Sequence, residues 1–327
     1  MEAATLNEPD LSLYRSRQGY DAIRRWYDGL LDSFEVQVAS HTIDTRFGST
    51  HMLVAGPEDG EPIVLVQALA GSAPLWYHQM PALAQQYRVY ALDTPGQPGR
   101  SAPNPPPLLK GGYSNWLLDV LDALGLPSAH FAGVSSASWY IMRLAIQAPE
   151  RVRKLVMVSP TGIVGARFPF KIMLTRVLNK KKDADALEDD LTTRSFMPES
   201  ATEEYDRQLA RAMALATRHY RLEKSLGIVN ERTGRISTWA GLKLVRTLFL
   251  PERRRLLKQL RTPGLIILGE HEMLYNSPAL VRRVKRSLPT LDAVIIPGTG
   301  HSAMYDRPDL VNAEILSFLG AASSSRG

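Results

Sequence analysis

Short apolar runs recur along the chain and alternate with segments of helical periodicity. The segments between the runs carry apolar residues at the spacing of one helix face, as in "YSNWLLDVLDALG" and "SWYIMRLAIQAPERV". Strands that are apolar throughout and are each followed by a helix are typical of a parallel sheet covered on both faces. The pattern therefore predicts an α/β fold. The predicted strands are 62–68, 87–93, 129–135, 154–160, 264–270 and 291–298.

Two regions depart from this alternation. The segment "FEVQVASHTIDTRFGSTHMLVAG" has two alternating runs around Phe47-Gly48, which predict a hairpin at one edge of the sheet. Between the strands at 154–160 and 264–270 only helical patterns occur, including 202–226 and 241–260. The predicted organisation is an N-terminal helical extension (1–33), an α/β core (34–164 and 261–320), a helical cap insertion (165–260) and a disordered tail (321–327).

Composition narrows the class of protein. The chain has 327 residues, of which 44% are hydrophobic and 22% charged, as in globular proteins. It has no cysteine, which excludes disulfides, thiolate catalysis and cysteine zinc sites. No apolar run approaches the roughly 18 residues of a membrane span. The start, "MEAATLNEPDLSLYRSRQGYD", has no secretory signal pattern, so we expect a cytoplasmic protein.

The positive charge is concentrated in one third of the chain. Residues 166–260 hold 20 Lys and Arg against 12 Asp and Glu, whereas the net charge of the whole chain is +6. No nucleic-acid motif accompanies this excess, so we expect a solvated helical surface and no nucleic-acid partner. Arg253, Arg254 and Arg255 are consecutive in "PERRRLLKQL". On a helix they point in different directions and do not form one anion clamp.

Three serines follow the predicted strand at 129–135, in "AHFAGVSSASWYIMRLA". A nucleophile elbow requires small residues two positions before and two positions after the nucleophile, because the turn is very sharp. Ser135 has Gly133 and Ala137 at these positions, whereas Ser136 has a branched residue before it. Ser135 is therefore the candidate nucleophile, and Ser138 is the expected helix N-cap.

A serine nucleophile needs a histidine as base and an acid that orients the histidine. His301 lies in "IIPGTGHSAMYDRPDL", after the last predicted strand, and "ILGEHEMLYN" ends the preceding strand. Active sites of parallel α/β sheets form at the carboxyl ends of the strands. The order serine, acid, histidine predicts Ser135, Glu272 and His301 as a catalytic triad. Glu270 is the alternative acid.

These motifs together resemble the α/β-hydrolase superfamily, over nearly the whole chain from Phe34 to Gly320. The family's GxSxG matches "GVSSA", with alanine for the last glycine, and its acid strand and GHxxxxxxP segments match "GEHE" and "GHSAMYDRP". Its D-x-P-G-x-G-x-S turn matches "DTPGQPGRS", which is one residue longer than the family form. The stretch "ALAGSAPLWYHQMPAL" is similar to the small cap-bearing carboxylesterases of bacteria. The resemblance implies a mostly parallel sheet with helices on both faces and an inserted helical cap. It places the acid on Glu272 and the base on His301.

The loop after the first parallel strand departs from the family. The family has His-Gly there, and this chain has Gln67-Ala68. The resemblance implies an oxyanion hole formed by the backbone N–H groups of Leu69 and Ser136. Losing the glycine removes a permissive backbone position, and we expect the downstream pair "GS" at 71–72 to compensate.

The resemblance implies a serine hydrolase that cleaves small carboxylic esters through an acyl-enzyme on Ser135, without a metal or organic cofactor. An apolar acyl or alcohol part is expected in the substrate. Carbon–carbon bond hydrolases, lactonases, cofactor-free haloperoxidases and aminopeptidases share the triad and stay open as alternatives. A non-catalytic, ligand-binding protein of this fold is a second alternative, and an interaction protein acting through the basic region is a third. The oligomeric state, a homodimer included, is open.

The predicted cap is expected to set the choice of substrate. Most of its apolar side chains are expected to pack the cap onto the core, and one or two to face the substrate. These side chains are Phe168, Phe170, Ile172, Met173, Trp239, Leu242 and Val245.

Overall fold

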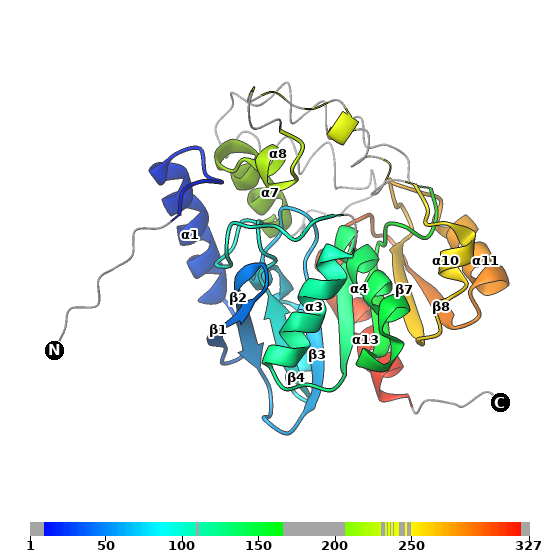
Figure 1. Ribbon diagram of the computed structural model, residues 1–327. Helices are drawn as coiled ribbons and strands as arrows, with labels where there is room; N and C mark the ends of the chain where they lie inside the picture. Colours follow the sequence, from blue (N-terminus) through cyan, green and yellow to red (C-terminus); the bar gives the residue numbers. More distant parts are fainter. Residues whose placement is uncertain are drawn as a thin grey trace.

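A computed structural model shows one twisted eight-stranded sheet with helices on both sides (Figure 1). It describes residues 10–108, 111–165, 207–229, 233, 235, 237, 239–241, 246 and 250–321. The strand order is β1-β2-β4-β3-β5-β6-β7-β8, and all pairs from β4 to β8 are parallel. The predicted α/β fold is therefore confirmed. The strands are Ala39–Thr45 (β1), Gly48–Ala55 (β2), Glu61–Val66 (β3), Tyr87–Leu92 (β4), Ala129–Val134 (β5), Val152–Val158 (β6), Gly264–Gly269 (β7) and Leu291–Ile296 (β8).

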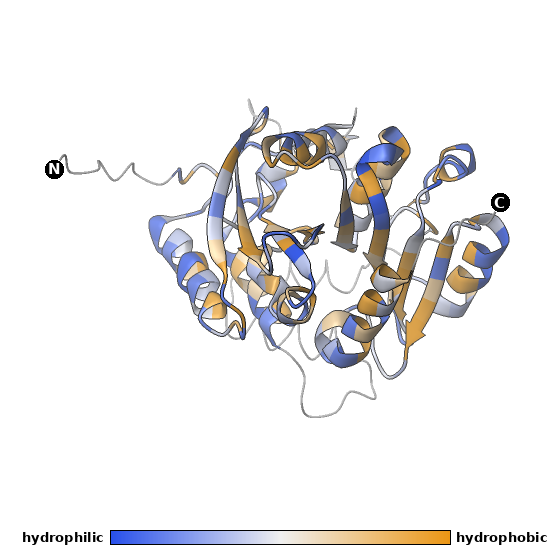
Figure 2. Cartoon of the chain, turned by 90° about the horizontal axis from the view of Figure 1, so that it is seen from below, coloured by the Kyte–Doolittle hydropathy of each residue, from blue (hydrophilic) through white to orange (hydrophobic). Residues whose placement is uncertain are grey.

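The helices form two layers that cover the sheet. Because side chains alternate along a strand, Ile63 and Leu65 of β3 face one layer, and Val64 and Val66 face the other. Figure 2 shows apolar residues along the strands and hydrophilic residues on the outer sides of the helices. The helices are Arg17–Leu31 (α1), Ala73–Trp76 (η1), Gln79–Leu83 (α2), Gly112–Ala123 (α3), Ser136–Gln147 (α4), Pro149–Arg151 (η2), Gln208–His219 (α7), Leu222–Ser225 (α8), Arg254–Leu257 (α10), Ser277–Ser287 (α11), Ala303–Asp306 (α12) and Pro308–Gly320 (α13).

The predicted hairpin forms the antiparallel edge of the sheet. Strands β1 and β2 pair with Thr45 opposite Gly48, so the turn is Arg46-Phe47. Gly48 has a φ of +97°, which glycine adopts without steric cost. Strand β2 then pairs antiparallel with β4 and joins the hairpin to the parallel part of the sheet.

The N-terminal helix packs against the segment that interrupts the alternation. Helix α1 begins after Ser16, whose hydroxyl accepts the Gly19 N–H at 3.1 Å. It lies beside α7 (Figure 1), and a Cβ added at Gly19 would approach the His219 side chain to 2.8 Å. The Trp26 indole N–H also donates to the Gln208 side chain at 3.0 Å. Helix α1 is thus a structural support for α7.

One helix predicted in the interrupting segment is divided in two. The pattern at 202–226 predicted one continuous helix, but α7 ends at His219 and α8 begins at Leu222. Tyr220 between them is extended and pairs with Tyr14, so a tertiary contact overrides the local periodicity. Within 241–260, Gly241 and Arg246 are helical and α10 spans Arg254–Leu257, whereas 242–245 and 247–249 lie outside the described residues.

Parts of the predicted organisation lie outside the described residues. These include residues 166–206, the tail after 321, and six of the seven apolar cap side chains named above. The seventh, Trp239, is 70% exposed. In the described part of the chain no helix is both long and apolar enough to cross a membrane.

Candidate active site

Ser135 lies in a strained turn between β5 and α4. Its φ of 50° and ψ of −112° fall in a region that non-glycine residues rarely adopt, as at a nucleophile elbow. A Cβ added at Gly133 would meet the Ala137 carbonyl carbon and Ile141 Cδ1, each at 2.9 Å. Gly133 is therefore a steric requirement of this turn. Ser135 itself is half-buried at the carboxyl end of the central strand β5.

Helix α4 starts earlier than the sequence predicted. We expected Ser138 as the N-cap, but the helix begins at Ser136 and Ser135 occupies the cap position. The Ser138 hydroxyl instead donates to the Gly133 carbonyl at 2.7 Å. The prediction was wrong because the elbow passes directly from strand to helix, and the serine inside the first turn closes back onto the strand.

Hydrogen bonds to Val158 and Ser159 bring Ser135 and His301 to the end of β6. The Ser135 N–H donates to the Val158 carbonyl at 2.9 Å, at the last residue of β6. The next residue, Ser159, has a φ of 46° and donates its hydroxyl to the His301 carbonyl at 3.2 Å. Thr161 N–H also donates to the Ser135 carbonyl at 3.2 Å. The two candidate residues, which are distant in sequence, thus share the carboxyl end of β6.

His301 contacts Glu272 and not Glu270. His301 Nδ1 lies 2.9 Å from both carboxylate oxygens of Glu272. The Glu272 side chain is fully buried, and Leu274 N–H donates to its Oε1 at 3.0 Å. The Glu270 carboxylate is 52% exposed and accepts the Gly298 N–H at 2.9 Å. Of the two predicted acids, the structure brings only Glu272 to the histidine.

The pair is electrostatically coupled. Burial is the largest single influence on the pKa of each side chain and opposes its charge, but the other interactions together outweigh it. The pKa of Glu272 is therefore lowered, because the charge and hydrogen bond of His301, with Leu274 N–H and the Ser159 hydroxyl, outweigh burial. The pKa of His301 is raised, because the Glu272 carboxylate outweighs burial. With Nδ1–H donated to the carboxylate, Nε2 is left as the basic nitrogen of neutral His301.

Side-chain oxygens hold the loop in which the family has His-Gly. The backbone N–H groups of three successive residues, 68–70, each donate to a side-chain oxygen. The last of them, Ala70, has a positive φ of 68°. Gly71 N–H closes the turn onto the Ala68 carbonyl at 2.9 Å, and a Cβ at Gly71 would crowd that oxygen at 3.0 Å. The acceptors are Gln67 Oε1 for Ala68 at 3.1 Å, Ser136 Oγ for Leu69 at 2.9 Å and Gln97 Oε1 for Ala70 at 2.8 Å.

The two glutamines were not foreseen from the sequence. Gln67 is buried and its amide also donates to the Tyr305 hydroxyl at 3.1 Å, so one side chain links the loop to α12. Gln97 stands within "DTPGQPGRS", whose length already departed from the family pattern. The extra length was the only sign in the sequence that this turn is unusual. The role of Gln97 became clear only from the structure, because its side chain accepts the N–H of Ala70, 27 residues earlier in the chain.

A buried pair of tyrosines continues from Ser136. The Tyr113 and Tyr140 rings stack with centroids 3.9 Å apart. Burial raises the pKa of Tyr140 to about 12, although the neighbouring hydroxyls of Ser136 and Tyr113 act to lower it. Ser136 and Tyr140 are four residues apart on one helix face, which is the sequence signal for this contact. The Ser136 hydroxyl thus joins α4 to the Leu69 loop.

A second serine, histidine and acid meet at the antiparallel edge, and we call Ser40, His51 and Asp93 the edge cluster. The Ser40 hydroxyl hydrogen bonds to His51 Nε2, and His51 Nδ1 lies 2.9 Å from Asp93 Oδ2. The fully buried Asp93 carboxylate also accepts the Tyr27 hydroxyl at 2.9 Å. It further accepts two backbone N–H groups, those of Ala73 and Arg100.

The described part of the chain places no group of three or more His, Cys, Asp or Glu side chains where they could hold a metal ion.

Comparison with known proteins identifies the family. A model of the alpha/beta hydrolase family matches residues 63–314. Carboxylesterase YbfK of Bacillus subtilis is 28% identical over 295 residues, which cover 90% of this chain and 92% of that protein. The crystal structure of carboxylesterase CesB (YbfK) aligns with a TM-score of 0.75 at 25% identity, over 93% of this chain and 99% of the other. Naproxen esterase (carboxylesterase NP) of Bacillus subtilis aligns with a TM-score of 0.72 at 26% identity, over 91% and 96%. This chain belongs to the alpha/beta hydrolase family.

Proposed function

We propose that the protein hydrolyses carboxylic esters through an acyl-enzyme formed on Ser135, with Ser135, Glu272 and His301 as its catalytic triad (the proposed triad). One observation carries the proposal. His301 is hydrogen-bonded to the buried Glu272 at the carboxyl ends of the parallel strands, where the strained Ser135 also lies. The relatives named as carboxylesterases, which match nearly the whole chain, support the same reaction.

The proposed reaction has two halves. Ser135 Oγ attacks the ester carbonyl carbon while His301 Nε2 takes the hydroxyl proton, and a tetrahedral intermediate forms. His301 returns the proton to the alkoxy oxygen, the C–O bond breaks and the alcohol leaves. Water then attacks the acyl carbon, with His301 again taking and returning the proton, and the acid is released. Glu272 holds Nδ1–H and stabilises the imidazolium in both halves.

The oxyanion is proposed to bind the N–H groups of Leu69 and Ser136. Ser136 is the first residue of α4, and the first N–H groups of a helix have no partner within it. The helix N-terminus also carries partial positive charge. Leu69 N–H donates to the Ser136 hydroxyl, which holds this amide beside the nucleophile until it is shared with the oxyanion. Removing one such donor costs roughly 10²–10³-fold in kcat in characterised enzymes.

Residues 165–260, between β6 and β7, were predicted to form a helical cap. We propose that this segment sets the choice of substrate. The substrate is then a small ester with an apolar acyl or alcohol part, and no organic cofactor takes part. A cytoplasmic location and a homodimer stay predictions, to be checked by cell fractionation and by the mass measured in solution.

The test is turnover on p-nitrophenyl esters of increasing acyl length and on naproxen esters, together with labelling by a serine-directed fluorophosphonate. We expect the unmutated protein to hydrolyse the esters and to be labelled at Ser135. The S135A variant should show neither hydrolysis nor labelling. Labelling without ester turnover would move the function to another triad reaction, such as that of a lactonase. Neither labelling nor turnover would leave the ligand-binding alternative.

A further inference from the structure

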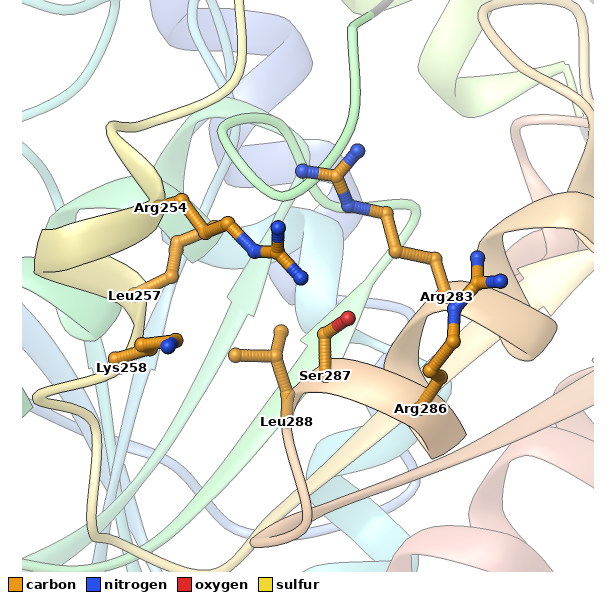
Figure 3. A pocket seen from close by; sticks show the side chains of 7 residues that line it. All are labelled: Arg254, Leu257, Lys258, Arg283, Arg286, Ser287 and Leu288. Carbon is orange, nitrogen blue, oxygen red and sulfur yellow. The ribbon is translucent and has the colours of Figure 1, made fainter.

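A cavity of about 450 Å³ opens between α10 and α11, and no residue of the proposed triad lines it (Figure 3). Its walls come from two segments separated by β7, and four of its seven lining side chains are cationic. The lining residues are Arg254, Leu257, Lys258, Arg283, Arg286, Ser287 and Leu288. We call this cavity the basic pocket.

The cations of the basic pocket face one another across two helices. In Figure 3 the Arg254 guanidinium points toward α11, and that of Arg283 extends from α11 toward the α10 side. Among the described residues, no carboxylate forms an ion pair with any of the four cations. The acid nearest to them in sequence, Glu252, contacts Arg143 at 3.6 Å and the Trp139 indole N–H at 2.8 Å. Within the part of the chain that the structure describes, the pocket therefore holds several positive charges without a paired carboxylate.

Packing keeps these charges together in spite of their repulsion. Leu257 and Leu288 are 3% and 4% exposed and belong to the same buried cluster, so both walls rest on the core. The carbonyl end of α11 stabilises a cation such as Arg286. It does not account for Arg254 and Lys258, which come from the other segment. The free energy of this arrangement falls when an anion enters.

We propose that the basic pocket binds a small molecule carrying two or more phosphate groups. Arginine guanidinium groups bind phosphate oxygens in pairs through parallel N–H donors, and lysine adds a point charge. The Ser287 hydroxyl adds a neutral donor, and Leu257 and Leu288 offer apolar contact to a carbon part of the ligand. The volume is in the range of small-molecule sites, roughly 300–1,000 Å³. This site is independent of the proposed ester hydrolysis.

Calorimetric titration of the full chain with inorganic tripolyphosphate, at one fixed salt concentration, tests the proposal. The variant R283Q/R286Q removes two charges from the pocket, and its matched control R282Q/K285Q removes two charges from the same helix outside the lining. We expect the Kd to rise at least about tenfold in the first variant and less than about twofold in the control. R254Q/K258Q removes two charges from the opposite wall and should repeat the loss.

Each variant should show the natural thermal unfolding transition by circular dichroism, which separates lost binding from lost folding. An equal loss of tripolyphosphate affinity in R283Q/R286Q and R282Q/K285Q would show that binding depends only on the overall positive charge of the surface, and would overturn the proposal.

The phosphate groups can belong to a soluble molecule or to a lipid headgroup, and sedimentation with vesicles distinguishes them. Vesicles of cardiolipin, whose headgroup carries two phosphate groups, mixed with phosphatidylcholine are compared with vesicles of phosphatidylcholine alone. Tripolyphosphate binding without vesicle binding assigns a soluble ligand. Vesicle binding that R283Q/R286Q removes and R282Q/K285Q keeps assigns a headgroup. Binding to neither probe, or vesicle binding that both variants lose equally, would overturn the site.

Discussion

The proposed triad and the edge cluster contain the same kinds of side chain but lie in different parts of the sheet. In both, the histidine Nδ1 is 2.9 Å from a fully buried carboxylate. The proposed triad lies at the carboxyl ends of parallel strands, where Ser135 has a φ of 50° and precedes a helix. The serine of the edge cluster, Ser40, is an exposed residue of the regular strand β1. A serine, histidine and acid in contact are therefore not sufficient to identify a nucleophile.

The two carboxylates also differ in what they hold. Asp93 accepts hydrogen bonds from the Tyr27 hydroxyl, His51 and the backbone of two loops, so it ties α1, β2 and the loop after β4 together. Glu272 accepts its hydrogen bonds from His301 and from Leu274, two residues away. The first arrangement joins distant segments of the fold, and the second orients one histidine. The following experiments test this distinction.

The largest effect is expected at the two serines. S135A removes the proposed nucleophile and should lower kcat/KM for p-nitrophenyl butyrate by about 10⁴-fold or more. S40A should change it less than twofold, because Ser40 lies on the edge strand β1, away from β5, with its hydroxyl bound to His51. A comparable loss in S40A would show that the edge cluster takes part in turnover.

The two acids should separate activity from stability. E272Q should lower kcat by roughly 10³–10⁴-fold, because His301 loses the carboxylate that orients it. D93N should mainly lower the free energy of unfolding, by about 3–5 kcal/mol, because it disturbs a buried network of charge-assisted hydrogen bonds. Steady-state kinetics of both variants measure kcat, and denaturant unfolding measures the free energy of unfolding. E270Q is the control and should change neither quantity much, since Glu270 is half exposed.

The pH dependence of kcat/KM should follow His301. The base must be neutral, so activity rises as the pH increases through the pKa of His301, which lies above its usual value near 6.5. E272Q removes the carboxylate that raises this pKa, so the inflection should move to lower pH. H51Q should leave it in place. An inflection that moves in H51Q and stays in E272Q would reverse the roles of the two clusters.

The same pair also links stability to pH. The raised pKa of His301 stabilises the fold fully below the usual histidine value, and this contribution is lost as the pH rises through the raised pKa. The lowered pKa of Glu272 stabilises the fold above the usual value near 4.5, and this contribution is lost as the pH falls through the lowered pKa. Both contributions are therefore present between about pH 4.5 and 6.5.

The smallest effect is expected at the loop of residues 68–70. S136A removes the hydroxyl that accepts Leu69 N–H and should lower kcat about tenfold, or about 1.4 kcal/mol in activation free energy, with little change in KM. Y140F keeps that acceptor and should cost less. S72A is the control, because the buried Ser72 hydroxyl has no hydrogen-bond partner in the described part of the chain. Equal kinetics for S136A and S72A would remove Ser136 as a positioning residue.

The family motifs were readable from the sequence because each one is local. The elbow depends on the size of residues two positions away from Ser135, and the strands depend on apolar runs of a few residues. Prediction was weaker wherever two segments meet. The single helix expected at 202–226 is divided because Tyr220 pairs with Tyr14, a contact that no periodicity encodes.

By itself the sequence determined the α/β order of the elements, the antiparallel edge and the family, since these follow from patterns within a few residues of each other. Three features depend on how the chain packs: Glu272 meets His301, side chains up to 67 positions away hold the loop at 68–70, and Arg254 faces α11. The three neighbouring arginines of "PERRRLLKQL" do not converge on the pocket: Arg254 alone of them lines it, with partners from another helix. Such contacts depend on how segments that are distant in sequence pack together, and the local spacing of residues carries no information about that packing.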